Sequence, residues 1–227
     1  MSNTSSSKLV PCIVLVVACL TSTAAAQGTA AGCPDSCGGD GGIKIQYPFG
    51  IGEGCFRKGF EILCNGSVPV LAGSTTQVVP LNNLSISTAE ARVMLPVAWE
   101  CFFNSGSSAK ADSVWSNGDV QFNTEGVYRI SNTHNQLVVV GCNSMGFTKS
   151  QRNEGGAIYG YAFATGCMSF CNNSGSAVDG ACAGVGCCRV DIPPGITDNT
   201  MDFKPYDHEG MVGFSPCDYA FFVDREN

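Results

Sequence analysis

Histidine and charged residues are both scarce in this chain. Only two of its 227 residues are histidine, and charged residues make up 14% of it. His134 and His208 fall in unrelated contexts, and neither belongs to an H-E-x-x-H motif or lies near a G-x-S-x-G turn. Catalysis requires a positioned nucleophile, acid, base or metal, and no motif for one is present. The sequence therefore predicts a protein that is not an enzyme, with both histidines at the surface.

Long apolar runs are also missing after residue 27. None approaches the ~18 residues that a transmembrane helix needs, which predicts no membrane span there. The apolar segment Leu9–Leu20 has the length of a signal-peptide core, and Ala24 and Ala26 fit the small-residue cleavage pattern. We therefore expect residues 1–26 to be a cleaved signal peptide and the protein to be secreted. A signal anchor fits less well because the run is short.

Neither half of the chain carries an excess of basic residues. Residues 27–110 hold five Lys or Arg against six Asp or Glu, and residues 111–227 hold six against thirteen. Nucleic acids and anionic lipids both require a basic footprint, so the acidic second half argues against either partner. A polyanion, if one binds, is expected on the first half.

Cysteine, by contrast, is abundant. Of fourteen cysteines, Cys12 and Cys19 leave with the signal peptide. Twelve remain, an even number that predicts full pairing into disulfides in an oxidising compartment. The spacings Cys33-x3-Cys37 and Cys167-x3-Cys171 also resemble zinc-ligand pairs, but disulfides are strongly favoured in a secreted chain, so we expect no metal site and no cofactor. The predicted disulfide cysteines are Cys33, Cys37, Cys55, Cys64, Cys101, Cys142, Cys167, Cys171, Cys182, Cys187, Cys188 and Cys217.

The spacing of these cysteines bears on domain organisation. The Gly- and Ser-rich stretch after Cys101 suggests a boundary between a lobe at 27–110 and a second lobe at 111–227. Five cysteines then precede the boundary and seven follow it. Either at least one disulfide joins the two lobes, or the boundary is misplaced. Cys187 and Cys188 are adjacent and are expected to bond two different partners.

Short β-branched runs bounded by turn-forming residues predict a mainly β fold, a disulfide-rich secreted ectodomain of two small β lobes with little helix outside the signal peptide. The expected strands are 43–47, 60–64, 68–71, 77–81, 92–102, 126–130, 136–142, 157–165, 188–192 and 219–223. Three N-x-S/T sequons at Asn65, Asn83 and Asn172 are predicted glycosylation sites, each with an ordinary polar loop as the alternative.

A basic and aromatic surface is the strongest candidate for binding. Lys44, Arg57, Lys58 and Arg92 hold most of the positive charge of the first half. Aromatic faces stack on sugar rings, and Arg and Lys recognise carboxylates, so the combination suits an acidic polysaccharide. The interleaved aromatics, most of which we expect in the core, are Tyr47, Phe49, Phe56, Phe60, Trp99, Phe102 and Phe103.

Several sequence blocks carry a family resemblance. The block Cys33–Cys64 contains a Cys-Gly pair, the segment YPFGI and a G-F-x-x-x-C strand. The later blocks are Leu137–Asn143 (LVVVGCN), Gly166–Cys171 (GCMSFC), Cys182–Cys188 (CAGVGCC) and Phe214–Phe222 (FSPCDYAFF). In order and spacing they resemble the extracellular galacturonan-binding domain and ectodomain of plant wall-associated receptor kinases.

The resemblance implies non-catalytic binding of cell-wall pectin through de-esterified galacturonan, an acidic cell-wall polysaccharide. It implies an extracellular or cell-wall location, or the plasma membrane if the chain is part of a longer receptor, and full-length receptor kinases as partners. EGF-like and kinase segments of the family are not recognised in this sequence. Calcium is a candidate bridge to pectin because the protein is acidic. The alternative function is a protein-interaction module that recognises a cell-surface or pathogen protein through residues 111–227.

Overall fold

The structure is a computed structural model of the chain. It describes the residues 32–38, 42–74, 77–104, 112–121, 127–149, 164–177, 179–206, 208 and 210–226. The predicted signal peptide lies outside them. Within the described part, no helix is long and apolar enough to cross a membrane.

The described residues form a mainly β fold, as the sequence predicts, with one short 3₁₀ turn at Ser174–Ser176. The strands are β1 (Ile62–Asn65), β2 (Val68–Leu71), β3 (Leu81–Ser85), β4 (Glu90–Val93), β5 (Ala98–Phe103), β6 (Asp112–Ser116), β7 (Asn135–Val140), β8 (Ser144–Lys149), β9 (Ala164–Ser169), β10 (Cys187–Asp191), β11 (Met201–Pro205) and β12 (Cys217–Asp224).

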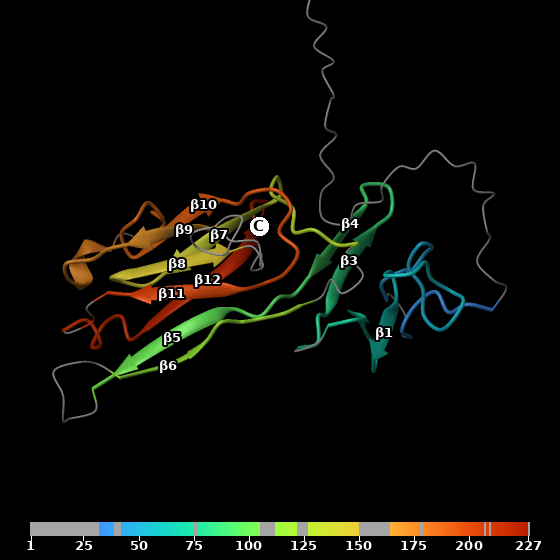
Figure 1. Ribbon diagram of the computed structural model, residues 1–227, viewed down its shortest axis with the longest axis horizontal. Coiled ribbons are helices and arrows are strands. Elements are labelled where there is room, and N and C mark those ends of the chain that lie inside the picture. The colour runs from blue at the N-terminus through green and yellow to red at the C-terminus, as the bar shows by residue number, and fades with distance from the viewer. Residues whose placement is uncertain are drawn as a thin grey trace, which may run out of the picture.

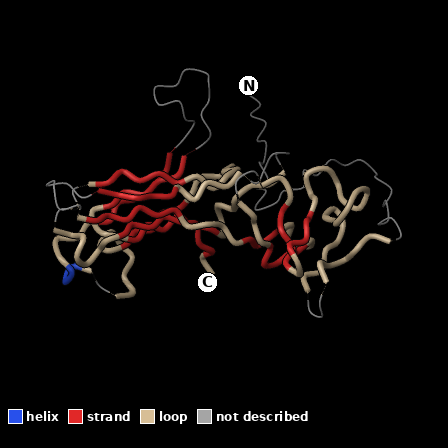
Figure 2. Tube along the Cα trace, turned by 90° about the horizontal axis from the view of Figure 1, so that it is seen from below, coloured by secondary structure: helices blue, strands red, loops and turns tan. Residues whose placement is uncertain are grey.

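Two antiparallel sheets pack face to face and form what we call the sandwich. One has the strand order β10-β7-β12-β5-β6, and the other the order β11-β8-β9. Figure 2 shows them as two layers of strands at one end of an elongated molecule. Along β7, Leu137 and Val139 are fully buried while their neighbours are more exposed, which is the period-two pattern of a strand with one face in the core.

The second sheet reaches the first closely because β8 turns small residues inward. Ser144, Gly146 and Thr148 are buried on its inner face. A Cβ atom placed on Gly146 would lie 2.7 Å from the Val139 side chain of β7, closer than side chains pack. Glycine at this position therefore sets the separation of the two layers.

Replacing Gly146 by valine (G146V) should lower the free energy of unfolding by about 1–3 kcal/mol, because the core has no room for the added methyl groups. Urea denaturation with the disulfides intact measures the change. Gly213 is the matched control, since a Cβ there meets nothing within 4 Å. Equal losses in G146V and G213V would contradict the packing argument.

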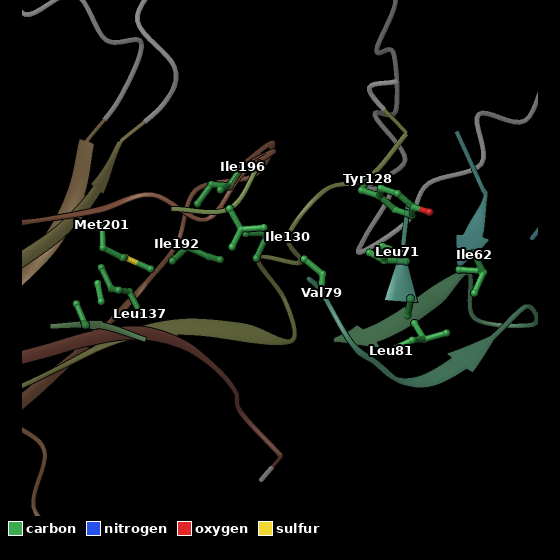
Figure 3. Packing of buried hydrophobic residues seen from close by; sticks show 14 of the residues in the cluster. Ile62, Leu71, Val79, Leu81, Tyr128, Ile130, Leu137, Ile192, Ile196 and Met201 are labelled. Carbon is green, nitrogen blue, oxygen red and sulfur yellow. The ribbon is translucent and has the colours of Figure 1, made fainter. Parts of the chain in front are cut away.

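The N-terminal lobe consists of the hairpins β1-β2 and β3-β4 and of the irregular segment 42–60 before them. Figure 1 places it beside the sandwich along the long axis. Its core includes Phe60, which meets Phe49 edge-on with ring centroids 5.1 Å apart. The buried hydrophobic residues form one cluster that runs from this lobe into the sandwich. In Figure 3, Val79 and Ile130 lie between Leu71 on one side and Ile192 on the other.

All twelve predicted cysteines are paired. The bridges are Cys33–Cys55, Cys37–Cys64, Cys101–Cys217, Cys142–Cys171, Cys167–Cys188 and Cys182–Cys187. The adjacent Cys187 and Cys188 bond different partners, which confirms that prediction. Cys167–Cys188 ties β9 to β10 and so joins the two sheets.

Cys101–Cys217 is the bridge between the two groups of cysteines that the odd division requires. It joins β5 to β12, two neighbouring strands of one sheet in which the two cysteines are register partners. The division of the chain at residue 110 stays a prediction. The strand β5 before it pairs with β12 and with β6.

The predicted strands agree with the structure unevenly. β2, β7, β10 and β12 lie where they were expected to within a few residues. The segment 43–47 is not a strand; its Ile45 amide instead donates to the carbonyl of Asp35. Residues 127–130 are not a strand either, and the expected strand at 157–165 lies almost wholly outside the described residues. The sequence reasoning missed β6, β8 and β11.

Candidate ligand-binding sites

Two of the four predicted cations sit next to each other on an exposed turn. Arg57 and Lys58 follow Cys55, which Cys33 holds by a disulfide. The turn is fixed by its backbone: the Arg57 amide donates to the carbonyl of Pro48 at 2.9 Å, and the Arg57 carbonyl accepts from Phe60 at 2.8 Å. Both side chains are exposed, so the turn presents two positive charges from a stapled backbone.

Lys44 is exposed as well and forms an ion pair with Asp35. Its ammonium lies 2.6 Å from the carboxylate of Asp35, and both side chains are largely exposed to solvent. The hydrogen bond from Lys44 and its charge hold the pKa of Asp35 below the usual range. A ligand carboxylate would have to compete with Asp35 for this lysine.

Arg92, the fourth predicted cation, lies on β4 and contacts the end of the chain. Its Nη1 atom is 2.7 Å from a carboxylate oxygen of Asp224, and its Nη2 atom is 3.8 Å from one of Glu226. In Figures 1 and 2 the C-terminus lies near the middle of the long axis, where the two lobes meet. Arg92 of the N-terminal lobe is therefore paired with Asp224 at the end of β12 in the sandwich.

The aromatic residues expected beside these cations divide between core and surface. Phe49, Phe60 and Phe102 are buried, Tyr47 and Phe103 are more than 40% exposed, and the remaining two, Phe56 and Trp99, are half-buried. Of the seven aromatic residues, only Tyr47 and Phe103 are therefore well exposed to a ligand.

A cavity of about 340 Å³ opens where the lobes meet, and we call it the junction cavity. Its walls come from β4 and the residues after it, from 128–130, from the start of β7 and from the end of β12. The lining residues are Leu71, Asn82, Glu90, Ala91, Arg92, Val93, Met94, Leu95, Pro96, Tyr128, Arg129, Ile130, His134, Asn135, Phe221, Phe222, Val223 and Asp224. Most are apolar, with a few charged groups among them.

Two contacts between an acidic and a basic side chain link the lobes at this cavity. Glu90 and Arg92 are alternate residues of β4 and so share one face of the strand. Glu90 lies 3.0 Å from Nε2 of His134, and Arg92 contacts Asp224. Sequence reasoning singled out Arg92 as a candidate polysaccharide ligand on the basis of charge, and it predicted no cavity and no ligand role for Arg129 or His134. The sequence around Arg129 and His134 does not indicate this position, because the other walls of the cavity come from β4 and β12, which are distant along the chain.

His208 corrects the expectation that both histidines lie at the surface. Its side chain is 1% exposed, and its Nε2 atom lies 3.2 Å from a carboxylate oxygen of the fully buried Asp218. The ring stacks on Phe102 with centroids 3.7 Å apart, and Nδ1 lies 2.9 Å from the carbonyl oxygen of Tyr206. The sequence gives no sign of this burial, because Asp218 and Phe102 come from β12 and β5.

The surroundings of His208 raise its pKa. Burial acts to lower the pKa, but the contact with Asp218, the carbonyl of Tyr206 and the nearby charge of Glu100 together outweigh it. In the described part of the chain neither oxygen of Asp218 has a hydrogen-bond partner, so we treat the contact as an ion pair. Its depth inside the sandwich points to a structural role.

The three predicted glycosylation sites lie on the surface of the described structure. Asn65, Asn83 and Asn172 are exposed, as sugar attachment would require, and their glycosylation stays a prediction. Among the residues that the structure describes, no three His, Cys, Asp or Glu side chains gather to hold a metal ion.

Comparison with known proteins points to one family. The family model for wall-associated receptor kinase galacturonan-binding matches residues 33–94. Wall-associated receptor kinase 2 of Arabidopsis thaliana is 31% identical over 198 residues, covering 85% of this chain and 24% of the relative. Wall-associated receptor kinase-like 10 of the same plant is 32% identical over 233 residues, covering 87% and 27%. The chain thus spans about a quarter of the length of these curated relatives. No solved structure matches it.

Proposed function

Because residues 33–94 belong to the wall-associated receptor kinase galacturonan-binding family, we propose that the protein binds cell-wall pectin, through de-esterified galacturonan, without catalysing a reaction. The family match is the observation that carries the proposal. We place the protein outside the cell, in or at the wall, and propose full-length receptor kinases as further partners.

The charges of the N-terminal lobe support this proposal. Galacturonan carries a carboxylate on every sugar, so a protein that holds it needs exposed cations in a fixed arrangement. Arg57 and Lys58 meet this need because their backbone is anchored and their side chains are exposed. Lys44 adds a third cation whose pairing with Asp35 is exposed to solvent and therefore weak.

Reversing the charges of Arg57 and Lys58 in one variant (R57E/K58E) should weaken binding to polygalacturonate by roughly tenfold, since two attractions become repulsions. Retention on immobilised polygalacturonate, measured as a function of salt, tests this. The affinity of the natural protein should itself fall as salt rises, because exposed charges are screened.

R189E is the matched control, since Arg189 is an exposed arginine on β10 of the sandwich. It should leave retention unchanged. If the natural protein with intact disulfides is not retained at low salt, with or without calcium, the pectin proposal is wrong. A protein partner that binds through residues 111–227 would instead be indifferent to R57E/K58E.

A further inference from the structure

The junction cavity has the size of a small-ligand site, and neither Arg57 nor Lys58 is among its lining residues. Its volume of about 340 Å³ is at the lower end of the range for such sites. It can hold one or two rings, whereas a polymer needs a long open surface. Leu71, Tyr128 and Phe222 are among the residues that supply apolar walls on which the face of a ring can pack.

The charged groups of the cavity favour a carboxylate as the polar part of that ligand. Arg92 divides its guanidinium between two carboxylates, with Asp224 at 2.7 Å from Nη1 and Glu226 at 3.8 Å from Nη2. One ligand carboxylate could take both nitrogens at once, which is the stronger, bidentate arrangement. Arg129, Glu90 and His134 also line the cavity. Arg129 donates to the carbonyl of Tyr128 at 2.6 Å, and Nε2 of His134 faces the Glu90 carboxylate at 3.0 Å, which leaves Arg92 as the cation that a ligand carboxylate would take.

The present partner of Arg92 is well placed to be displaced. The Arg92 side chain is 42% exposed and that of Asp224 is 20% exposed, so the pair is only partly withdrawn from water. Exposed and half-exposed pairs contribute little to stability. The backbone amide of Glu226 would still hold Asp224, because it donates to Oδ1 at 3.0 Å.

We propose that the junction cavity is a binding site for a small ring-bearing monocarboxylate, whose carboxylate replaces Asp224 on Arg92. Such a ligand is either a sugar acid or an aromatic acid with a single carboxylate. The site uses residues of both lobes and is separate from the surface proposed for the polymer, so each site can fail without the other.

Isothermal titration calorimetry of the whole protein tests the site with three probes. Galacturonate, with its single carboxylate, represents the sugar acids, 4-hydroxybenzoate represents the aromatic acids, and lactose is the uncharged sugar control. We expect one of the two acids to bind and lactose not to bind. Absence of binding by both acids would overturn the proposal, as would equal binding of lactose.

Two substitutions should change the affinity for the bound acid in opposite directions. R92Q should weaken it by ~10-fold or more, because the charged partner of the carboxylate is lost. D224N should strengthen it by ~2- to 5-fold, because the competing carboxylate is removed while the amide keeps its shape. If Arg92 and Asp224 only hold the lobes together, neither variant should strengthen binding, and that result would overturn the proposal.

A third variant separates the cavity from the polymer-binding surface. Met94 lines the cavity and is 61% exposed, so M94W should block the cavity without disturbing the core. It should abolish acid binding while retention on polygalacturonate stays as in the natural protein. R57E/K58E should do the reverse. Unchanged acid binding by M94W, with its thermal stability intact, would contradict the cavity as the site.

Discussion

Replacing His208 by alanine (H208A) is expected to lower the free energy of unfolding by about 3–5 kcal/mol. The reason is the buried partner: Asp218 is fully buried, and without His208 its charge is left uncompensated inside the sandwich, which is the costly way to break a buried ion pair. The loss of the stacking on Phe102 adds to the effect. Urea denaturation with the disulfides intact measures it.

The surroundings of this pair leave little room for a substitute. A Cβ atom at Gly141 would overlap the Asp218 carboxylate, so the backbone passes directly against it. Glu100, which accepts a hydrogen bond from Ser113 at 2.8 Å, adds a second acidic group on the neighbouring strand. His208 is therefore the cation near two acidic residues in a site closed to water.

The stability that His208 contributes should depend on pH in a defined direction. The pKa of His208 is raised by folding. Its contribution is therefore complete below the pKa of an unfolded histidine, about 6.5, and is lost as the pH rises through the higher pKa of the folded state. The difference in stability between the natural protein and H208Q should accordingly be largest in mild acid and shrink in alkali.

His134 supplies the control for these measurements. Its side chain is 40% exposed and contacts Glu90, so H134A should cost no more than about 1 kcal/mol. Similar decreases in the free energy of unfolding of H208A and H134A would show that the buried pair stabilises the protein no more than the exposed one. An unfolding free energy of H208Q that tracks the natural protein at every pH would contradict the assigned direction of the pKa.

The cysteines were predictable because the compartment alone determines their chemistry. An oxidising location and an even number are enough to predict that all twelve pair, and the odd division of five and seven requires a bridge such as Cys101–Cys217. The individual partners were not predictable. They depend on which strands become neighbours, and the sequence between Cys101 and Cys217 does not say that β5 and β12 will pair.

β8 shows why the alternation of apolar and polar residues fails to predict some strands. Its apolar residues Met145 and Phe147 lie on the more exposed face, and the inner face carries Ser144, Gly146 and Thr148. The pattern is inverted because the opposite sheet, with Val139 and Ala220, comes too close for larger side chains. Alternation reports burial only where the buried face is also the apolar one.

Of the two candidate sites, one could be predicted from the sequence and the other could not. Arg57 and Lys58 are neighbours in sequence, so their joint exposure on one turn could be anticipated from the chain. The junction cavity could not, because Arg92 meets Asp224 only after the C-terminal strand returns to the N-terminal lobe. Counting charges in the sequence identifies the candidate cations. It does not show which of them form ion pairs with residues distant in the chain, as Arg92 does with Asp224.

The second large effect is expected from removing the bridge between β5 and β12. Replacing both of its cysteines by serine (C101S/C217S) should lower the free energy of unfolding by about 4–5 kcal/mol, because the bridge closes a long loop in the unfolded chain. The two cysteines are 116 residues apart. They also face each other in the register of the sheet, so the native strands keep their hydrogen bonds without the bridge.

The pair C182S/C187S tests whether loop length is the cause. Its cysteines are only 5 residues apart, so the same chain-entropy argument gives a loss of about 2 kcal/mol. Urea denaturation of both variants under non-reducing conditions should therefore show C101S/C217S as the less stable by about 2–3 kcal/mol. Equal losses would mean that the long bridge does not stabilise the protein through the unfolded chain.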